Sequence, residues 1–412
     1  MFQQLNDTPE LPLLAAPRVE AHFVDQLEAL RSAVELLKRG TGPLAVDAER
    51  ASGFKYSQRA YLVQVHREGS PIFLIDPIAF SSDELQLLAE FMNDQEWILH
   101  AATQDLACLA ELGLHPKTLF DTELISRLLG FERVGLGAVC ELALGVRLAK
   151  EHSAADWSTR PLPESWLVYA ALDVDVLPEM RKYLLAEVER QQKQEFVLQE
   201  MRHLLGFKPK GQKLDKWRSM TGIHDLREQR QLAIAKSLWE AREALAQRLD
   251  VSPGRLIPDS SVVHAAKSLR RSKSELAGDK SFNGRASRSY LDTWWSAIEA
   301  GQNTRELPPM RAASIGIPNH RNWANKFPDA AARYSQAREA IAKLSEELKI
   351  PVENILSPDP LRQLCFEPAG LDKDAIALQL GQLGARAWQL ELVSDPIALA
   401  WESAKQGQTQ AV

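Results

Sequence analysis

The sequence predicts a mixed α/β domain with a central sheet, followed by all-helical domains. Three observations support this prediction. In the first part of the chain, short apolar strand-like segments give way to strands that alternate with amphipathic helices. Beyond residue 121 only helical periodicity is found. The polar, basic stretch FKPKGQKLDK at residues 207–216 contains a proline and a glycine and has the composition of a linker.

The strands and helices of the first domain can be assigned in chain order. Residues 43–49, 61–66 and 71–76 are strand-like and have short connections, which predicts an antiparallel meander. An amphipathic helix near residues 84–92 and a buried strand at residues 97–101 follow. This order predicts a mixed sheet with helices packed on its faces. The remaining expected elements are a helix at 104–112, a strand at 118–120 and a last helix at 163–195.

The chain is expected to form three domains joined by two linkers. At 412 residues it exceeds what one hydrophobic core usually covers. The sequence AREA occurs at 241–244 and again at 337–340, which favours a duplicated helical module, although short matches of this composition also arise by chance. The expected limits are 1–206 for the α/β domain, 207–216 for the first linker, 217–300 for the first helical domain, 301–315 for the second linker and 316–412 for the C-terminal helical domain.

The composition is that of a soluble globular protein, with 45% hydrophobic and 25% charged residues. No apolar run approaches the roughly 20 residues needed to span a bilayer, so no membrane partner is expected. The three cysteines, Cys108, Cys140 and Cys365, are far apart, which indicates neither a disulfide framework nor a zinc site. We therefore expect a protein of the reducing cytoplasm.

The charge is unevenly divided along the chain. The formal net charge is −6, but residues 1–200 carry roughly −13 and residues 201–310 roughly +8, while the remainder is near neutral. Because a partner responds to the local field and not to the average, the basic middle segment is compatible with a nucleic-acid partner.

Carboxylates occur near the ends of two predicted strands. In LAVDAER, Asp47 and Glu49 are two residues apart, so both side chains point to the same face of a strand. Two carboxylates on one face repel each other, and Mg²⁺ or Mn²⁺ between them would remove that repulsion. Asp105 follows the strand WILHA and opens a helix, where the helix dipole alone also favours an acidic residue. Ligands of open α/β sheets bind at the carboxyl ends of strands, which favours a metal site here.

A third candidate lies on the predicted helix WLVYAALDVDVL. Tyr169 and Asp173 are four residues apart, hence one turn apart on one face. A buried tyrosine is usually a core residue whose hydroxyl has a partner. The pairing of Tyr169 with an acidic residue is therefore the informative feature.

The segments AVDAE, HAATQDL and YAALDVDVL resemble the three exonuclease motifs of the DEDD superfamily, in its tyrosine subclass. The approach to the third motif, SAADWSTRPLPESWLVYAALDV from Ser153, narrows the resemblance to the ribonuclease D family. The resemblance covers roughly residues 20–200, with the motifs in the expected order. The chain departs from it at His100, where many superfamily members have asparagine, and the last hundred residues match only loosely.

The resemblance implies a ribonuclease H-like catalytic fold, an HRDC domain after it, and a more divergent second HRDC-like copy at the C-terminus. It implies two-metal hydrolysis of RNA 3′ ends with Mg²⁺ or Mn²⁺, releasing nucleoside monophosphates. Asp47 would bridge both metals, Glu49 and Asp173 would complete the site of the attacking water, Asp105 would hold the second metal through waters, and Tyr169 would orient the water. The implied substrate is an RNA with a free 3′ end, such as a tRNA precursor or another structured RNA, with no obligate protein partner evident.

The charge division assigns RNA capture to the basic middle segment, because clustered carboxylates repel a phosphate backbone unless metals are bound. Basic residues and nearby aromatic residues there are typical of RNA-binding surfaces, although charge runs are more often solvated helix faces. The residues predicted to contact RNA are Lys267, Arg270 and Arg271 in this segment, and Gln64, Trp157 and Arg160 near the 3′ end.

Two other functions remain open from the sequence. The same chemistry could act on DNA, as in a Werner-type 3′–5′ exonuclease, although an HRDC arrangement favours ribonuclease D. A non-catalytic RNA-binding scaffold would keep the fold without the reaction, but a protein that has lost its activity has normally also lost at least one metal-ligand residue. The intact set of four carboxylates and Tyr169 speaks against the scaffold.

Overall fold

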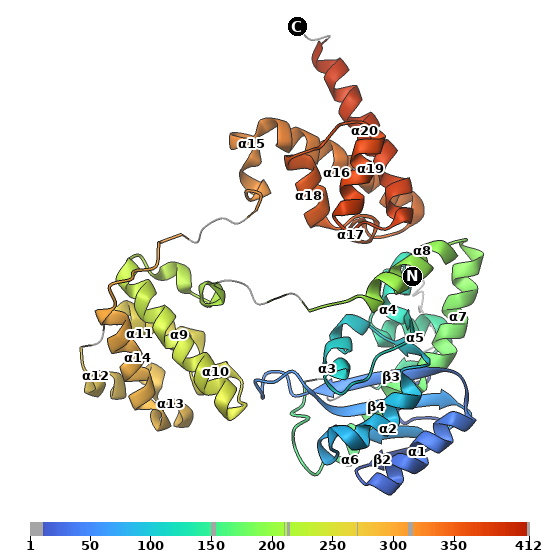
Figure 1. Cartoon of the computed structure of the whole chain (residues 1–412), viewed down its shortest axis with the longest axis horizontal. Coiled ribbons are helices and arrows are strands. Elements are labelled where there is room, and N and C mark those ends of the chain that lie inside the picture. Colours follow the sequence, from blue (N-terminus) through green and yellow to red (C-terminus); the bar gives the residue numbers. More distant parts are fainter. Residues whose placement is uncertain are drawn as a thin grey trace, which may run out of the picture.

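The computed structural model describes residues 11–149, 154–209, 211, 215–269, 271–311 and 316–409. Figure 1 shows an α/β domain, a first helical domain and a C-terminal helical domain, in that order along the chain. None of the described helices is long and apolar enough to cross a membrane. The predicted fold class, a mixed-sheet domain followed by helical domains, is confirmed.

The α/β domain is built on a six-stranded sheet in the order β2-β5-β4-β3-β6-β7. Strands β3, β4 and β5 form the predicted antiparallel meander, while β6 and β7 run parallel to β3 and β2 runs parallel to β5. The sheet is therefore mixed, as predicted. The strands are β2 (Ala21–Val24), β3 (Thr41–Arg50), β4 (Ala60–Glu68), β5 (Ile72–Ile75), β6 (Glu96–Leu99) and β7 (Thr118–Asp121).

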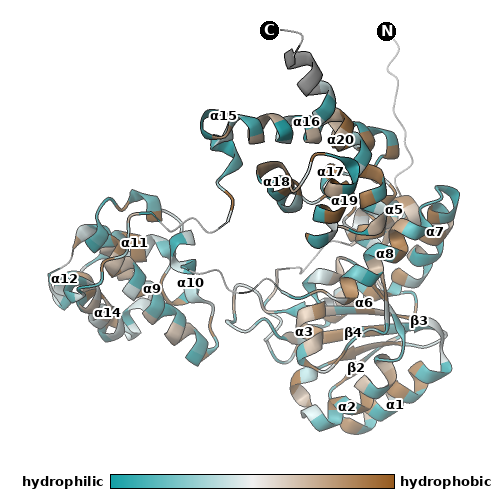
Figure 2. Ribbon diagram, turned by 45° about the horizontal axis from the view of Figure 1, so that its top comes forward, coloured by the Kyte–Doolittle hydropathy of each residue, from teal (hydrophilic) through white to brown (hydrophobic). Residues whose placement is uncertain are grey.

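Helices cover both faces of this sheet. Helices α1 (Leu27–Arg39) and α2 (Ser82–Met92) pack together on one side, and α6 (Glu164–Asp175) and α7 (Leu177–Arg190) pack over the central strands. Figure 2 shows the strands as the most apolar layer between these helices. The other elements are β1 (Leu13–Leu14), η1 (Pro77–Ala79), η2 (Ala102–Gln104), α3 (Leu106–Glu111), α4 (Thr122–Leu128), α5 (Leu136–Leu144), β8 (Arg147–Leu148) and α8 (Gln194–Leu205).

Three local predictions were wrong. Strand β2 was not predicted, because four residues are too short to show a periodic pattern. The prediction of helices alone beyond residue 121 missed β8, a two-residue strand that pairs with β1. The expected helix at 163–195 is instead two helices that meet at Val176, because Pro178 in the first turn of α7 has no N–H to continue the ladder from α6.

The first helical domain has its own hydrophobic core, which includes the buried rings of Trp217, Phe282 and Trp294. It touches the β3–β4 loop of the α/β domain, where the backbone N–H of Ser252 donates to the carbonyl of Phe54 at 2.9 Å. Its elements are η3 (Lys216–Ser219), η4 (Ile223–Asp225), α9 (Gln229–Leu249), α10 (Pro253–Leu256), α11 (Asp259–Ser268), α12 (Lys273–Ala277), η5 (Lys280–Phe282), α13 (Arg285–Ser289) and α14 (Leu291–Asn303).

The C-terminal domain repeats part of this element order. Helices α9 and α16 each have 21 residues, each is followed by a left-handed residue (Asp250 and Lys349), and each leads into a four-residue helix and then a longer one. This correspondence favours the duplicated module. The elements are η6 (His320–Asn322), α15 (Trp323–Lys326), α16 (Pro328–Leu348), α17 (Val352–Ile355), α18 (Pro358–Phe366), α19 (Lys373–Gln382) and α20 (Ala387–Thr409).

The C-terminal domain shares one hydrophobic core with the α/β domain. The rings of Phe196 and Trp388 stack with their centroids 4.5 Å apart. The buried carboxylate of Glu200 accepts hydrogen bonds from Arg386 at 2.6 Å and from the Trp388 indole at 2.9 Å. The Lys193 ammonium donates to the last carbonyl of α16 at 2.8 Å. The first and third domains are thus packed as one unit, although the first helical domain separates them in sequence.

Candidate active site

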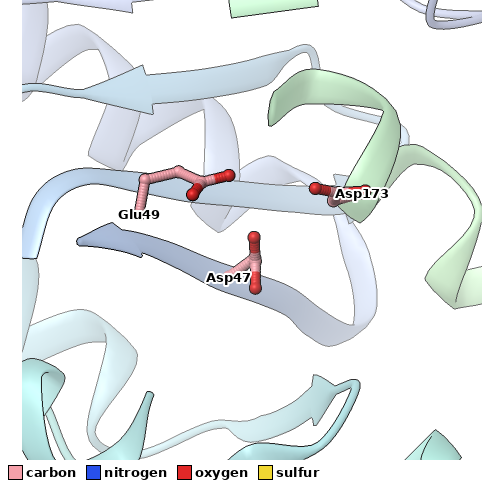
Figure 3. Close-up of side chains that lie close together, drawn as sticks. All are labelled: Asp47, Glu49 and Asp173. Atoms are coloured by element: carbon pink, nitrogen blue, oxygen red, sulfur yellow. The ribbon is translucent and has the colours of Figure 1, made fainter. Parts of the chain in front are cut away.

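Three carboxylates meet above the end of the central strand β3. Asp47 and Glu49 leave β3 on the same face, and α6, which packs over β3, brings Asp173 to them. One oxygen atom from each of the three residues lies within 4.8 Å of the other two. Figure 3 shows these carboxylates turned toward one another. The spacing predicted from the sequence therefore produces a real cluster of acidic oxygens.

Asp105 lies in the same cavity but outside this closest group of three. The cavity has a volume of about 810 Å³ and is lined by all four predicted carboxylates and by Tyr169. Asp105 follows a tight turn in which Ala101 adopts a left-handed conformation (φ 60°). The carboxylate of Asp121 holds this turn by accepting from the N–H groups of Ala101 (3.1 Å) and Ala102 (2.8 Å). Asp105 is therefore held in place both by the chain that follows β6 and by the hydrogen bonds of Asp121 at the end of β7.

Without a cation, the acidic residues of this cavity resist ionisation. Burial raises the pKa of Asp47 to about 6. Burial and then repulsion by neighbouring carboxylates raise the pKa of Glu49 and of Asp105 well above their ordinary values, and burial and repulsion by Asp47 do the same for Asp173. The positive charge of Arg50 opposes these effects only in part. These side chains offer only oxygen atoms as ligands, which suits a hard divalent cation, and a bound cation would favour the ionised carboxylates.

Tyr169 is a neutral hydrogen-bond donor in this cavity. Its hydroxyl donates to the carboxylate of Asp173. Burial, followed by the charges of Asp173, Glu49 and Asp47, raises the pKa of Tyr169 above its ordinary value. The ring packs against Trp157, with the two centroids 6.5 Å apart. Tyr169 can therefore orient a bound molecule but is a poor proton acceptor.

Three residues predicted to contact the RNA 3′ end are either buried or bound to other residues of the protein. Gln64 and Trp157 are both 0% exposed, so the prediction that they touch RNA directly was wrong. Gln64 pairs with Asp47 across the β3–β4 ladder, and α6 packs over β4. Arg160 makes a two-pronged ion pair with Asp76 at 2.6 and 2.7 Å and also donates to the carbonyl of Tyr61. Its guanidinium is therefore occupied by the protein itself.

The predicted contacts of the basic segment lie at the surface where they are described. Lys267 is exposed in the last turn of α11, and Arg271 is exposed just before α12. Arg270 lies outside the described residues. Among the neighbouring aromatic residues, Trp294 is buried in the core of this domain and donates to the carbonyl of Ser287. The cationic residues thus remain candidates for RNA contact, whereas Trp294 does not.

Two polar residues at the site, Arg50 and Asp121, were not predicted from the sequence, and His100 was noted only as a departure from the family motif. Arg50 directly follows the first motif and is the cation that eases ionisation of Asp47, Glu49 and Asp105. Asp121 was read only as the end of the strand-rich part of the chain. His100 lines the cavity, its Nδ1 lies 2.8 Å from the Thr122 hydroxyl, and burial lowers its pKa to about 4, so it is neutral near pH 7. The sequence offered two signals, the adjacency of Arg50 to the first motif and the position of His100 at the start of the second motif.

Comparison with known families covers all three domains. Residues 21–189 match the 3′-5′ exonuclease family, residues 231–298 match the HRDC domain, and residues 316–401 match the 3′ to 5′ exonuclease C-terminal domain. The chain is 30% identical over 271 residues to ribonuclease D of Zymomonas mobilis, covering 65% of this chain and 68% of that protein. It is 27% identical over 355 residues to ribonuclease D of Gluconacetobacter diazotrophicus, covering 84% and 86%.

Two solved structures resemble the whole architecture. A protein from Bifidobacterium adolescentis matches with a TM-score of 0.85 and 36% identity, covering 95% of this chain and 100% of that one. Escherichia coli RNase D matches with a TM-score of 0.62 and 24% identity, covering 88% and 98%, which is a likeness of fold. Together with the sequence relatives, these matches show that the chain belongs to the ribonuclease D family of metal-dependent 3′–5′ exoribonucleases.

Proposed function

We propose that this protein removes nucleotides one at a time from the 3′ ends of structured RNAs, such as tRNA precursors, by two-metal hydrolysis. The observation that carries the proposal is the group formed by Asp47, Glu49 and Asp173, within 4.8 Å of one another, with Asp105 in the same cavity. Two divalent cations, Mg²⁺ or Mn²⁺, would supply positive charge to the attacking and leaving oxygens of an in-line displacement.

Each residue has a proposed task. Asp47, at the centre of the cluster, would contact both cations, Glu49 and Asp173 would complete one site, and Asp105, outside the closest group, would hold the other through water. Tyr169 would orient the attacking water through its hydroxyl. Its raised pKa argues against a role as the base, so proton removal would depend on the cations and bulk solvent.

RNA capture is proposed to involve the basic first helical domain. The exposed positions of Lys267 and Arg271 support this, because a cationic surface outside the acidic cavity can attract the phosphate backbone. The end of α8 at Leu205 supports the first proposed limit, whereas α14 continues three residues beyond the proposed limit of 300, to Asn303. We retain residues 1–206, 217–300 and 316–412 as the proposed domains.

A labelled-substrate experiment tests the reaction. With Mg²⁺ or Mn²⁺, a 5′-labelled linear RNA should shorten in single-nucleotide steps, and a circular RNA of the same sequence should resist. Asp47→Asn should abolish this activity, whereas Glu90→Gln, which changes an exposed carboxylate on α2, should not. Undiminished hydrolysis by Asp47→Asn would refute the assigned metal site. Faster digestion of DNA than of RNA would instead refute the proposed substrate.

A further inference from the structure

The C-terminal domain contains a second cavity, formed where η6 and α15 meet α16. It has a volume of about 440 Å³ and small alanine side chains in its lining. His320 and Tyr334 face each other there, with ring centroids 5.5 Å apart and planes at 60°. The buried Trp323 packs against both rings and donates its indole N–H to the carbonyl of Pro318. The cavity therefore has a rigid aromatic wall whose Tyr334 ring is only partly covered.

Cationic side chains gather around this wall. The Arg338 guanidinium lies 5.8 Å from the centre of the Tyr334 ring. Burial, followed by the positive charges of Arg362, Arg321 and Arg338, lowers the pKa of His320.

Most of this positive charge is not neutralised by the protein. Arg362 pairs with Asp359 at 2.8 Å, and the one carboxylate in the cavity lining, Glu339, pairs with Lys343 at 3.0 Å. Within the described ranges, neither Arg321 nor Arg338 has a carboxylate oxygen within 4.0 Å. Like charges held together without partners repel, and an incoming anion would relieve that repulsion.

Guanidinium groups beside an aromatic ring match the chemistry of a nucleotide. A base can stack on the ring, and a phosphate can accept hydrogen bonds from arginine in a two-pronged geometry. We propose that this cavity binds one unpaired nucleotide of the RNA substrate, with its base against Tyr334 and its phosphate at Arg338. The inference rests on the proposed action on RNA and adds a binding site in the domain that lacks the carboxylate cluster.

The location of the site separates binding from hydrolysis. Residues 311–412 are near neutral overall, so binding here depends on the local group of arginines and not on a broad basic surface. An RNA long enough to reach both cavities gains affinity from both contacts, because the second becomes intramolecular. A dinucleotide is expected to be too short to bind both cavities at once, so this site should not help to hold it in the acidic cavity. The length of the RNA thus decides whether this site matters.

The experiment uses the full chain in two forms. For binding, Tyr334→Ala, Tyr334→Phe and Arg338→Gln are made in an Asp47→Asn background, which is expected not to hydrolyse RNA. The affinity for a long, unstructured, 5′-labelled RNA is measured by fluorescence anisotropy over a range of salt concentrations. Lys373→Gln is the charge-matched control, because Lys373 is exposed in the same domain and does not line the cavity. Thermal unfolding verifies that each variant is folded.

Tyr334→Ala and Arg338→Gln should each weaken binding about tenfold, and Arg338→Gln should also reduce the slope of log K against log salt by about 0.7. Tyr334→Phe should retain the affinity, since it keeps the stacking ring, and Lys373→Gln should change neither quantity. With Asp47 intact, Tyr334→Ala and Arg338→Gln should hydrolyse a dinucleotide at the unaltered rate.

Unchanged RNA affinity in both folded variants would overturn the inference. It would also be overturned if a nucleoside monophosphate, titrated alone, bound this cavity as tightly as the RNA, because the site would then hold the product. Inorganic phosphate is the third probe, and its binding at equal strength would reduce the site to one for simple anions. The proposed function fails separately, if the unaltered protein does not degrade RNA at all.

Discussion

Replacing Asp47 with asparagine should stabilise the metal-free protein at neutral pH while it abolishes hydrolysis. The ordinary pKa of this side chain is 3.8, and burial raises it to about 6 in the folded protein. A folded-state pKa above the unfolded one means that the unfolded state gives up its proton first. The stability contributed by the protonated group is therefore complete below pH 3.8 and is lost as the pH rises to about 6.

The size of this effect follows from the difference between the ordinary pKa of 3.8 and the folded-state pKa of about 6. At about 1.36 kcal/mol per unit, ionised Asp47 costs about 3 kcal/mol of the free energy of unfolding above pH 6. The uncharged amide of asparagine avoids that cost. After burial, the charge of Asp47 is the next largest cause of the raised pKa values of Glu49, Asp105 and Asp173, so its removal should also favour their ionised forms. A gain of about 3 kcal/mol corresponds to roughly 6–12 °C in the melting temperature of a domain of 150–250 residues.

Denaturant unfolding in EDTA at pH 8 and at pH 4 measures this difference directly. Asp47→Asn should be more stable than the unaltered protein at pH 8 and nearly equal to it at pH 4. Added Mn²⁺ should stabilise the unaltered protein strongly and the variant weakly, because a ligand that binds only the folded state adds stability. Glu90→Gln, on exposed α2 surface, should show neither effect. If metal-free Asp47→Asn were no more stable than the unaltered protein at pH 8, ionisation of the buried Asp47 would not destabilise the folded protein.

Three further changes test how the site and the domains are held. Asp121→Ala should cost about 2–4 kcal/mol of unfolding free energy, because it leaves buried backbone N–H groups without acceptors. The kcat should also fall, because Asp105 would be displaced. An unchanged midpoint in a urea titration would contradict the expected loss of stability. Glu200→Gln should cost about 3 kcal/mol of unfolding free energy, because the partly buried Arg386 would then face a neutral group. Hydrogen exchange in α20 should become faster, and an unchanged exchange rate would exclude this role. Asp250→Ala removes the carboxylate that accepts hydrogen bonds from the Ser57 N–H in the β3–β4 loop and from the Tyr61 hydroxyl. Limited proteolysis should then cut this loop faster. An unchanged cleavage rate would show that the contact with Asp250 does not hold the loop in place.

The sequence predicted the central strands because their alternation is strong and their connections are short. It predicted the shared face of Asp47 and Glu49 for the same reason, since side chains two apart on a strand must point the same way. It could not tell which residues on that face would stay accessible. Gln64 lies opposite Asp47 in the ladder, yet it is buried in a fold whose α6, distant in sequence, packs over β4.

Contacts made over long sequence separations account for the other differences. Asp121 supports the turn before Asp105 from a neighbouring strand, and no local pattern marks a carboxylate for that task. Arg160 was predicted to contact RNA near its 3′ end. Its partner Asp76 lies 84 positions away, and their pairing is visible only in three dimensions. Sequence periodicity therefore predicts helices, strands and the side chains that share a face, whereas hydrogen-bond and ion-pair partners can be identified only in the folded structure.

The packing of the third domain on the first has a consequence for synthesis of the chain on the ribosome. The apolar surface of α8 is covered by Trp388, whose indole bonds to a residue 188 positions earlier. At roughly 5–20 residues per second, about 10–40 seconds pass between translation of the two partners. During that interval the first helical domain can fold around its own core, while α8 still exposes a surface that a nascent-chain binding factor or another unfinished chain could capture.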